Sequence, residues 1–401
     1  MIKIIVPEPS VKEQQYVDAM LDPLLIRIGY LKISLKHLLE DSTEIQNNGI
    51  ESYKSVTVKI ICLMEGVRTY GKKEDFNAPK YLGTINKYLR SANNFQNFKI
   101  RELLDYLDDL EKDDAKLLKA MLSCPAEELF DFNISMKGNF HEVEIKILSL
   151  AINYGHKELS KAAKIFFRTH NFVHSCPYCN LENAKYKKGK RRSALSHVLD
   201  HFFCQADFPL LSLSMYNLVP CGTGCNGTDI KGEIPFTKEF HLNPYMDGFN
   251  DMVRFYPIKA GKEVIGVVAT PDCDPNSVAY KRILGDHTDK TSEQGLKKGN
   301  VNVFELETIY SDRLDEAQDV LNIMNKRLTG LRSISLFLGQ MVGLDAGKAY
   351  KKWYKGEMKT YFEPQYFHKK DMSKFKRDIH DFYILNDSIT KIDFVRKLIN
   401  Y

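Results

Sequence analysis

The sequence predicts a mostly helical α+β protein with a small metal-stabilised module at its centre. Apolar residues recur at helical spacing through residues 1–170 and again from residue 303 onward. Between these regions, residues 171–235 are rich in Cys, Gly, Asn, Pro and basic residues, a composition typical of a small module with little apolar core of its own. Two runs rich in β-branched and aromatic residues, 252–258 and 263–269, then predict a β-hairpin.

The length of 401 residues exceeds what one ordinary hydrophobic core serves, so we expect two or three domains. The changes in composition place the predicted boundaries at 1–170, 171–240 and 241–401. A hydrophobic content of 43% and a charged content of 27% are ordinary for a globular protein.

No run of about 18 apolar residues occurs, so the sequence predicts no transmembrane helix and no membrane partner. The apolar start, 1–7, is too short for a secretory signal, and we therefore expect a cytoplasmic protein. In a reducing compartment, clustered cysteines favour metal binding over a disulfide framework.

The N-terminal region reads as a series of helices. Ser10 and Glu13 fit a capping box at the start of the first, whose apolar positions include Met20, Leu24 and Ile28. Further helices are predicted near 51–69, 98–111, 113–123, 140–153 and 157–169. This half contains no evident catalytic constellation, and its leucine and aromatic stripes are interpreted as core.

The C-terminal region begins with the predicted hairpin and returns to helix. One face of a long helix is predicted to carry Leu314, Ala317, Leu321, Met324 and Leu328. Shorter helices near 374–384 and 390–400 are predicted to close the chain.

Four clustered cysteines form two pairs, Cys176-x2-Cys179 and Cys221-x3-Cys225. Two short cysteine turns facing each other supply the four tetrahedral ligands that zinc favours. Glycines 222 and 224 are interpreted as giving the longer second turn its freedom. Such an ion would be structural, because four protein ligands leave no open position for water. Four free cysteines are the alternative, and His174 or His197 are possible substitute ligands.

Polar residues lie between and just after the cysteine pairs. An apolar stretch, 194–199, predicts a short strand that ends at Asp200 and His201. Asn217 begins a second predicted strand, and Asn226 stands at the predicted start of a short helix that carries Lys231. Each residue alone is more often a surface or turn feature. Their joint occurrence beside a cysteine clamp favours a functional site.

In this order, residues 174–232 resemble the HNH endonuclease family, of the bacterial type, with its zinc-clamped ββα-metal fold. The resemblance implies that Asp200 is a metal-binding acid and that His201 is the general base. It also implies that Asn217 orients the loop and the base, and that Asn226 binds the catalytic metal.

The residue types suit phosphodiester hydrolysis. A neutral histidine such as His201 can take a proton from water at intracellular pH. A Mg²⁺ or Mn²⁺ ion on Asp200 and Asn226 would bind phosphate oxygens, since such an ion keeps few protein ligands.

A basic run precedes the Asp-His pair: Lys187, Lys188, Lys190, Arg191 and Arg192. Taken alone, such a run is usually a solvated loop, and the net charge of +5 predicts no partner. Beside a nuclease-like motif, a loop that contacts phosphate is the better interpretation. Lys231 is assigned the same role.

The sequence thus predicts a metal-dependent endonuclease that acts on DNA, with RNA not excluded. The alternative is a non-catalytic, zinc-stabilised module that binds nucleic acid. The size of the helical flanks further suggests an effector of a prokaryotic defence system, in which the flanks bind a protein partner or a second copy of the chain.

Overall fold

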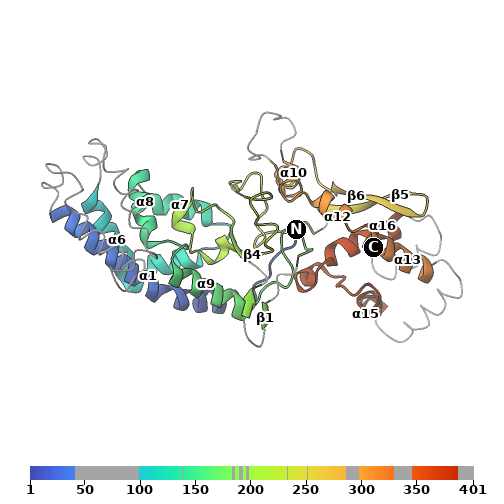
Figure 1. Cartoon of the computed structure of the whole chain (residues 1–401), viewed down its shortest axis with the longest axis horizontal. Helices are drawn as coiled ribbons and strands as arrows, with labels where there is room; N and C mark the ends of the chain where they lie inside the picture. The colour runs from blue at the N-terminus through green and yellow to red at the C-terminus, as the bar shows by residue number, and fades with distance from the viewer. Residues whose placement is uncertain are drawn as a thin grey trace. The chain divides into compact units, whose positions relative to one another are not determined.

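The computed structural model describes most of the chain (Figure 1). The described residues are 1–40, 99–138, 140–182, 186–188, 193–195, 198–232, 234–250, 252–285, 298–328 and 346–386. They form helices and small two-stranded sheets, which confirms the α+β class.

The chain divides into two compact units. The helical unit comprises Pro7–His170 and His201–Leu218. The mixed unit comprises Met1–Val6, Asn171–Asp200 and Val219–Tyr401. These boundaries differ from the predicted ones, because the segment 171–240 is shared between the units and the chain passes from one to the other within its two central strands.

Five helices build the helical unit, within the part of the chain that is described. They are α1 (Pro9–Glu40), α6 (Ile100–Ser123), α7 (Leu129–Lys137), α8 (Glu142–Ala151) and α9 (Lys157–His170). Two short 3₁₀ turns, η2 (Pro209–Leu211) and η3 (Met215–Asn217), belong to the same unit.

Helix α1 packs one apolar face against α6 and α9. Met20, Leu24 and Ile28 are buried on that face, as the helical spacing predicts. The predicted capping box is wrong, because α1 begins at Pro9 and places Ser10 inside the first turn. Proline suits that first position, since its missing N–H is one that a helix start leaves unpaired.

Helix α6 is interrupted in its middle. Residues Lys112–Ala115 have non-helical backbone angles and separate two helical segments. This agrees with the prediction of two helices, near 98–111 and 113–123. Helix α7 was not predicted, and the predicted helix near 51–69 lies outside the described residues.

The mixed unit contains three two-stranded sheets and several helices. The paired strands are β1 (Tyr186–Lys188) with β2 (Ser193–Leu195), β3 (Val198–His201) with β4 (Leu218–Cys221), and β5 (Val253–Ala260) with β6 (Glu263–Pro271). The helices are α10 (Val278–Leu284), α11 (Asn300–Val303), α12 (Leu306–Ser311), α13 (Leu314–Leu328), α15 (Ala346–Met358), η4 (Pro364–Lys369) and α16 (Ser373–Asn386).

The hairpin β5–β6 confirms the two predicted strands and packs on an aromatic core. Phe255 lies 4.6 Å from Tyr310, and Tyr310 stacks on Phe375 at 4.5 Å between ring centroids. The Tyr310 hydroxyl donates a hydrogen bond to the carbonyl of Cys179. The core therefore fixes the first cysteine turn directly.

The C-terminal helices also agree with the sequence pattern. Helix α13 buries Ala317, Leu321 and Met324, and α16 covers the predicted helix near 374–384. The predicted helix near 390–400 lies outside the described residues. Among the described helices, none is long and apolar enough to cross a bilayer.

Candidate functional site

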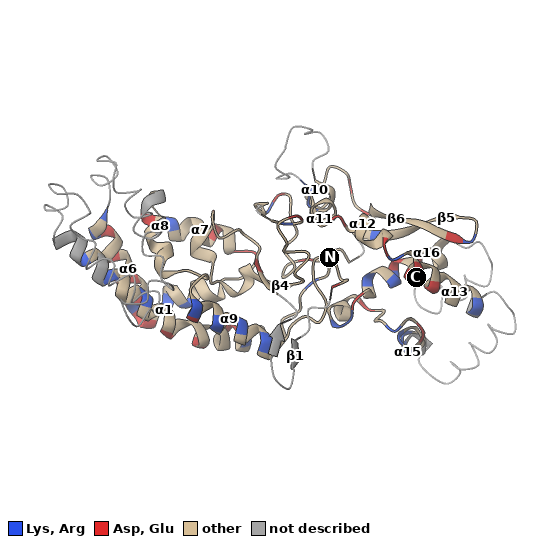
Figure 2. Ribbon diagram, in the orientation of Figure 1, with Lys and Arg blue, Asp and Glu red and all other residues tan. Residues whose placement is uncertain are grey.

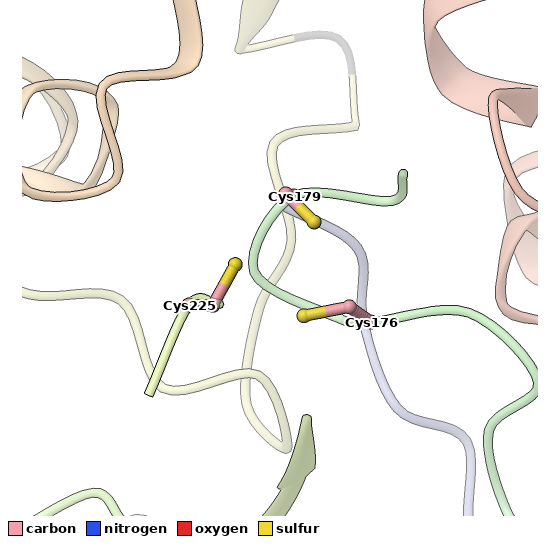
Figure 3. A group of neighbouring side chains, drawn as sticks. All are labelled: Cys176, Cys179 and Cys225. Atoms are coloured by element: carbon pink, nitrogen blue, oxygen red, sulfur yellow. The ribbon is translucent and has the colours of Figure 1, made fainter. Parts of the chain in front are cut away.

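Three buried cysteines form the candidate metal centre. The sulfur atoms of Cys176, Cys179 and Cys225 all lie within 4.8 Å of one another (Figure 3). Three soft sulfur donors at this separation suit a metal such as zinc, which binds thiolates at about 2.3 Å.

The surroundings of Cys179, in the first cysteine turn, favour the thiolate form of its side chain. The pKa of Cys179 is lowered well below its usual value by hydrogen bonds from Cys176 and Cys225 and from the backbone amides of Glu182 and Leu181. Burial raises the pKa of Cys176, because three neighbouring buried thiols cannot all ionise without a counter-charge. A bound cation would supply that charge, so the residues present fit the group.

Glu182 joins the two cysteine turns. Its carboxylate accepts hydrogen bonds from the amides of Gly224 at 3.1 Å and Cys225 at 3.2 Å, and its carbonyl accepts one from the amide of Cys176 at 2.9 Å. A Cβ atom at Gly222 or Gly224 would overlap this carboxylate. Neither glycine has a positive φ, so the predicted conformational freedom is not used there, and the two glycines instead leave room for the Glu182 carboxylate.

Cys221 does not join the cluster. It is fully buried at the end of β4, but its sulfur lies outside the group of three. Its pKa is raised by burial and by the nearby charges of Asp200 and Cys176. The predicted four-sulfur clamp is thus a three-sulfur cluster in this structure, with a further thiol nearby.

Asp200 is buried rather than open to a metal and water. Its carboxylate oxygens accept hydrogen bonds from the ammonium of Lys231 at 2.6 and 2.7 Å, and one also accepts the hydroxyl of Tyr178 at 2.6 Å. Only 5% of Asp200 and 3% of Lys231 are exposed. In this structure Asp200 and Lys231 neutralise each other's charge. Asp200 is therefore not open to a metal ion as predicted, and Lys231 is not open to a phosphate as predicted.

Aromatic rings enclose this ion pair. The Lys231 ammonium lies 4.5 Å from the centroid of the Phe236 ring, which stacks on His241 at 4.1 Å. Tyr178 stacks on Phe304 at 4.4 Å. Since such surroundings exclude water, separating the two charges would leave each of them poorly solvated.

The predicted helix after the second cysteine turn is absent. Residues 222–232 form successive turns, in which the amide of Asn226 donates to the carbonyl of Gly222 at 3.3 Å and that of Gly232 to the carbonyl of Gly227 at 2.9 Å. Four glycines in these eleven residues explain the outcome, because glycine disfavours helix. Asn226 itself is partly exposed.

His201 has a different environment from its neighbour. Its Nε2 atom lies 2.9 Å from the carbonyl oxygen of Ser212, and its ring meets the edge of Tyr154 at 4.9 Å. A carbonyl oxygen can only accept, so Nε2 is the donor in this contact, and in a neutral imidazole Nδ1 would be the unprotonated nitrogen. The side chain is partly exposed.

Asn217 braces the loop that carries this carbonyl. Its side-chain oxygen accepts the amide of Phe203 at 2.8 Å, and its amide group donates to the carbonyls of Phe203 at 3.2 Å and Leu211 at 3.1 Å. The Ser212 hydroxyl donates to the carbonyl of Ile152 at 2.9 Å. Side-chain bonds thus hold the loop at Leu211 and at Ser212, the residue that contacts the histidine.

The basic run is described only in part. Lys187 and Lys188 lie in β1, which pairs with β2, whereas Lys190, Arg191 and Arg192 lie outside the described residues, as does His197.

Sequence reasoning missed Tyr178, Glu182 and Ser212. Tyr178 sits inside the first cysteine turn, and Glu182 follows that turn by three residues, so their positions were a usable signal. Ser212 offers its backbone carbonyl, which no residue pattern reveals.

No known protein family, characterised protein or solved structure matches this chain.

Proposed function

We propose that the chain is an HNH-type endonuclease that hydrolyses DNA phosphodiester bonds, with His201 as the general base. The observation that carries the proposal is the hydrogen bond between Nε2 of His201 and the carbonyl of Ser212. In a neutral imidazole this bond favours the tautomer that is protonated at Nε2, and Nδ1 would then be the nitrogen that takes a proton from water.

Asn217 supports the same proposal. The family resemblance gives the central asparagine the task of orienting the loop and the base. The three side-chain hydrogen bonds of Asn217 hold the loop whose Ser212 carbonyl orients His201. A base held in this way loses little rotational entropy when it acts.

The donor set expected for the catalytic Mg²⁺ or Mn²⁺ ion does not fit as it stands. Both oxygens of Asp200 accept hydrogen bonds from Lys231, which leaves the partly exposed Asn226 as the remaining predicted ligand. Such an ion would neutralise charge on a phosphate.

A structural zinc ion on Cys176, Cys179 and Cys225 belongs to the proposal, with Cys221 as the fourth ligand after a side-chain adjustment. We expect about one zinc per chain, and its loss in Cys225→Ser. Cys204→Ser is the matched control, because Cys204 lies outside the cluster and is only partly buried. Elemental analysis of the purified variants measures the result. Full zinc content in Cys225→Ser would contradict the assignment.

The activity is tested by incubating the protein with plasmid and with single-stranded and RNA substrates, with Mg²⁺, with Mn²⁺ or with a chelator. We expect nicked or linear plasmid with wild type and none with His201→Ala. His141→Asn is the control, because it removes an exposed imidazole while asparagine preserves an N-cap acceptor for α8. Equal cleavage by wild type and His201→Ala would exclude His201 as the base.

A second candidate function is a zinc-stabilised module that binds nucleic acid without cutting it. The buried pair of Asp200 and Lys231 favours this reading, since an acid held for structure needs no metal. Salt-sensitive binding with no turnover under any divalent ion would support it.

The wider role that we propose is that of a cytoplasmic effector in a prokaryotic defence system, with a partner protein or a second copy bound through the helical flanks. Co-purification and size-exclusion chromatography with light scattering test this. A monomer that is fully active alone would count against it.

A further inference from the structure

Helix α9 presents a row of basic side chains. Lys157, Lys161 and Lys164 are exposed and Arg168 is partly exposed, at intervals of four, three and four residues. This spacing places all four on one face, which we call the α9 basic face. Figure 2 shows Lys and Arg recurring along this helix.

The sequence of α9 does not balance these charges. The helix buries Leu159, Ala163, Phe166 and Phe167 on its other face, and its acidic residue, Glu158, lies in the first turn. Like charges three or four residues apart destabilise a helix. The α9 basic face therefore works against helix formation, and an ordinary solvated face would carry both signs.

The first three lysines make no ion pair with any other described residue. Two lysines of helix α15 differ, because each has a close partner. Lys351 pairs with Glu363 at 3.3 Å, and the ammonium of Lys355 lies 4.6 Å from the ring centroid of Tyr361. The positive charge of Lys157, Lys161 and Lys164 is thus not neutralised by an acidic side chain among the described residues.

The α9 basic face continues to His201 within the helical unit. The ammonium of Lys164 lies 5.9 Å from the centroid of the Tyr154 ring, and that ring lies 4.9 Å from the ring of His201. One aromatic side chain therefore separates the row of positive charge from the proposed base.

We propose that the α9 basic face binds the phosphate backbone of the nucleic acid and leads it to His201. This inference rests on the proposed function. Eleven residues of helix span roughly 16 Å, and duplex DNA carries one charge per about 1.7 Å of axis, so four cations at this spacing face several phosphates. A contact of this kind reads no sequence and positions the duplex.

The test is duplex binding with a chelator present, measured by fluorescence anisotropy at several salt concentrations. The variant is Lys157→Ala/Lys161→Ala/Lys164→Ala. Loss of three phosphate contacts reduces the slope of log affinity against log salt by about one per lysine. Alanine favours helix, so the fold is retained, and circular dichroism checks this.

The matched control is Lys351→Ala/Lys352→Ala/Lys355→Ala on α15, which removes the same charge from another exposed helix. We expect its salt slope to stay within experimental error of wild type. An equal loss in both triple variants would overturn the proposal, because net charge alone would then explain the binding. An unchanged slope in the α9 variant would overturn it as well.

The same proteins are then assayed for plasmid cleavage and for binding to anionic phospholipid vesicles. If wild type cuts DNA and the α9 variant binds normally, the inference fails while the proposed function stands. If wild type neither binds nor cuts DNA, the proposed function fails with it. Binding to vesicles but not to DNA would assign the α9 basic face to a membrane surface and overturn the proposal.

Discussion

Asp200 and His201 are adjacent in β3 but lie in contrasting surroundings. The carboxylate of Asp200 is buried and accepts hydrogen bonds from Lys231 and Tyr178. The imidazole of His201 is partly exposed, with one nitrogen directed at the Ser212 carbonyl. Because successive side chains of a strand point to opposite faces, two neighbouring residues can serve two different purposes.

The contrast teaches that adjacent residues of one sequence motif can lie in different surroundings; under the proposed function, Asp200 is structural and His201 is chemical. The Asp200 side resembles a core, with an ion pair enclosed by Phe236 and Tyr178. The His201 side has an oriented ring and a braced loop. Substitutions on the two sides should therefore affect stability and activity differently.

The largest effect is expected at His201. His201→Ala should lower the cleavage rate by about 10²–10⁴-fold, the usual contribution of a general base. The melting temperature should stay close to that of wild type, because the side chain is partly exposed. Cleavage rates and thermal melts of the same preparations measure both. A large drop in melting temperature in His201→Ala would show that His201, like Asp200, mainly stabilises the fold.

The next effect concerns the ion pair. Lys231→Met should lower the free energy of unfolding by about 3–5 kcal/mol, because it leaves the buried carboxylate of Asp200 without its counter-charge. Urea denaturation measures this.

The double variant Asp200→Asn/Lys231→Met removes both charges and should recover part of the loss. A double-mutant cycle with the single variants isolates the coupling of the pair. If the losses in the free energy of unfolding are additive, the two charges do not stabilise each other. That result would argue against a structural role for the Asp200 carboxylate.

Low pH should destabilise the fold around Asp200 and Lys231, because it favours protonation of the buried His241. Burial, and then the charge of Lys231, lower the pKa of His241 to about 3. The unfolded chain has the higher pKa and binds the proton first, so stability falls as the pH drops below about 6.5 and continues to fall toward the folded value. By pH 4 the loss from this residue should reach about 3 kcal/mol.

Urea denaturation at pH 7, 5.5 and 4 measures this slope. His241→Leu should be less stable at pH 7 but should show a flatter dependence on pH. His141→Asn serves as the control, because His141 is exposed. An unchanged slope in His241→Leu would assign the acid sensitivity to other groups, such as His368, whose pKa burial lowers to about 4.

The smallest effect separates two similar serines. Ser212 and Ser214 are both buried, and their hydroxyls donate to the carbonyls of Ile152 at 2.9 Å and Met121 at 2.7 Å. Each serine-to-alanine change should cost about 1 kcal/mol of stability, the usual contribution of one hydrogen bond.

Only Ser212→Ala should also lower cleavage, by a few-fold, because the lost hydroxyl bond to Ile152 helps to hold the backbone carbonyl that contacts His201. Cleavage rates and urea denaturation of the two variants measure the difference. Equal cleavage by both would show that the position of this carbonyl does not limit the reaction.

The helices and the hairpin could be predicted because their signals are local. Apolar spacing placed α1, α13 and α16, and β-branched runs placed β5 and β6. The prediction of a helix after Asn226 was wrong, because the glycines in this segment disfavour helix formation. Glycines at 222, 224, 227 and 232 already disfavour a helix in the sequence.

The site could be predicted only in part. Cys176 and Cys179 meet because their spacing in one turn brings them together, and Cys225 joins them across 46 residues of chain. Cys221 has equally suitable spacing to Cys225 but lies outside the cluster, at the end of a buried strand.

The sequence by itself determined the helical periods, the hairpin and the residue types available for metal binding and proton transfer, because these depend on neighbours along the chain. Tertiary structure decided which partner each polar group meets. Lys231 stands 31 residues beyond Asp200, yet it binds both carboxylate oxygens. A buried charge must find a counter-charge from whatever element packs against it, and only the folded chain specifies that element.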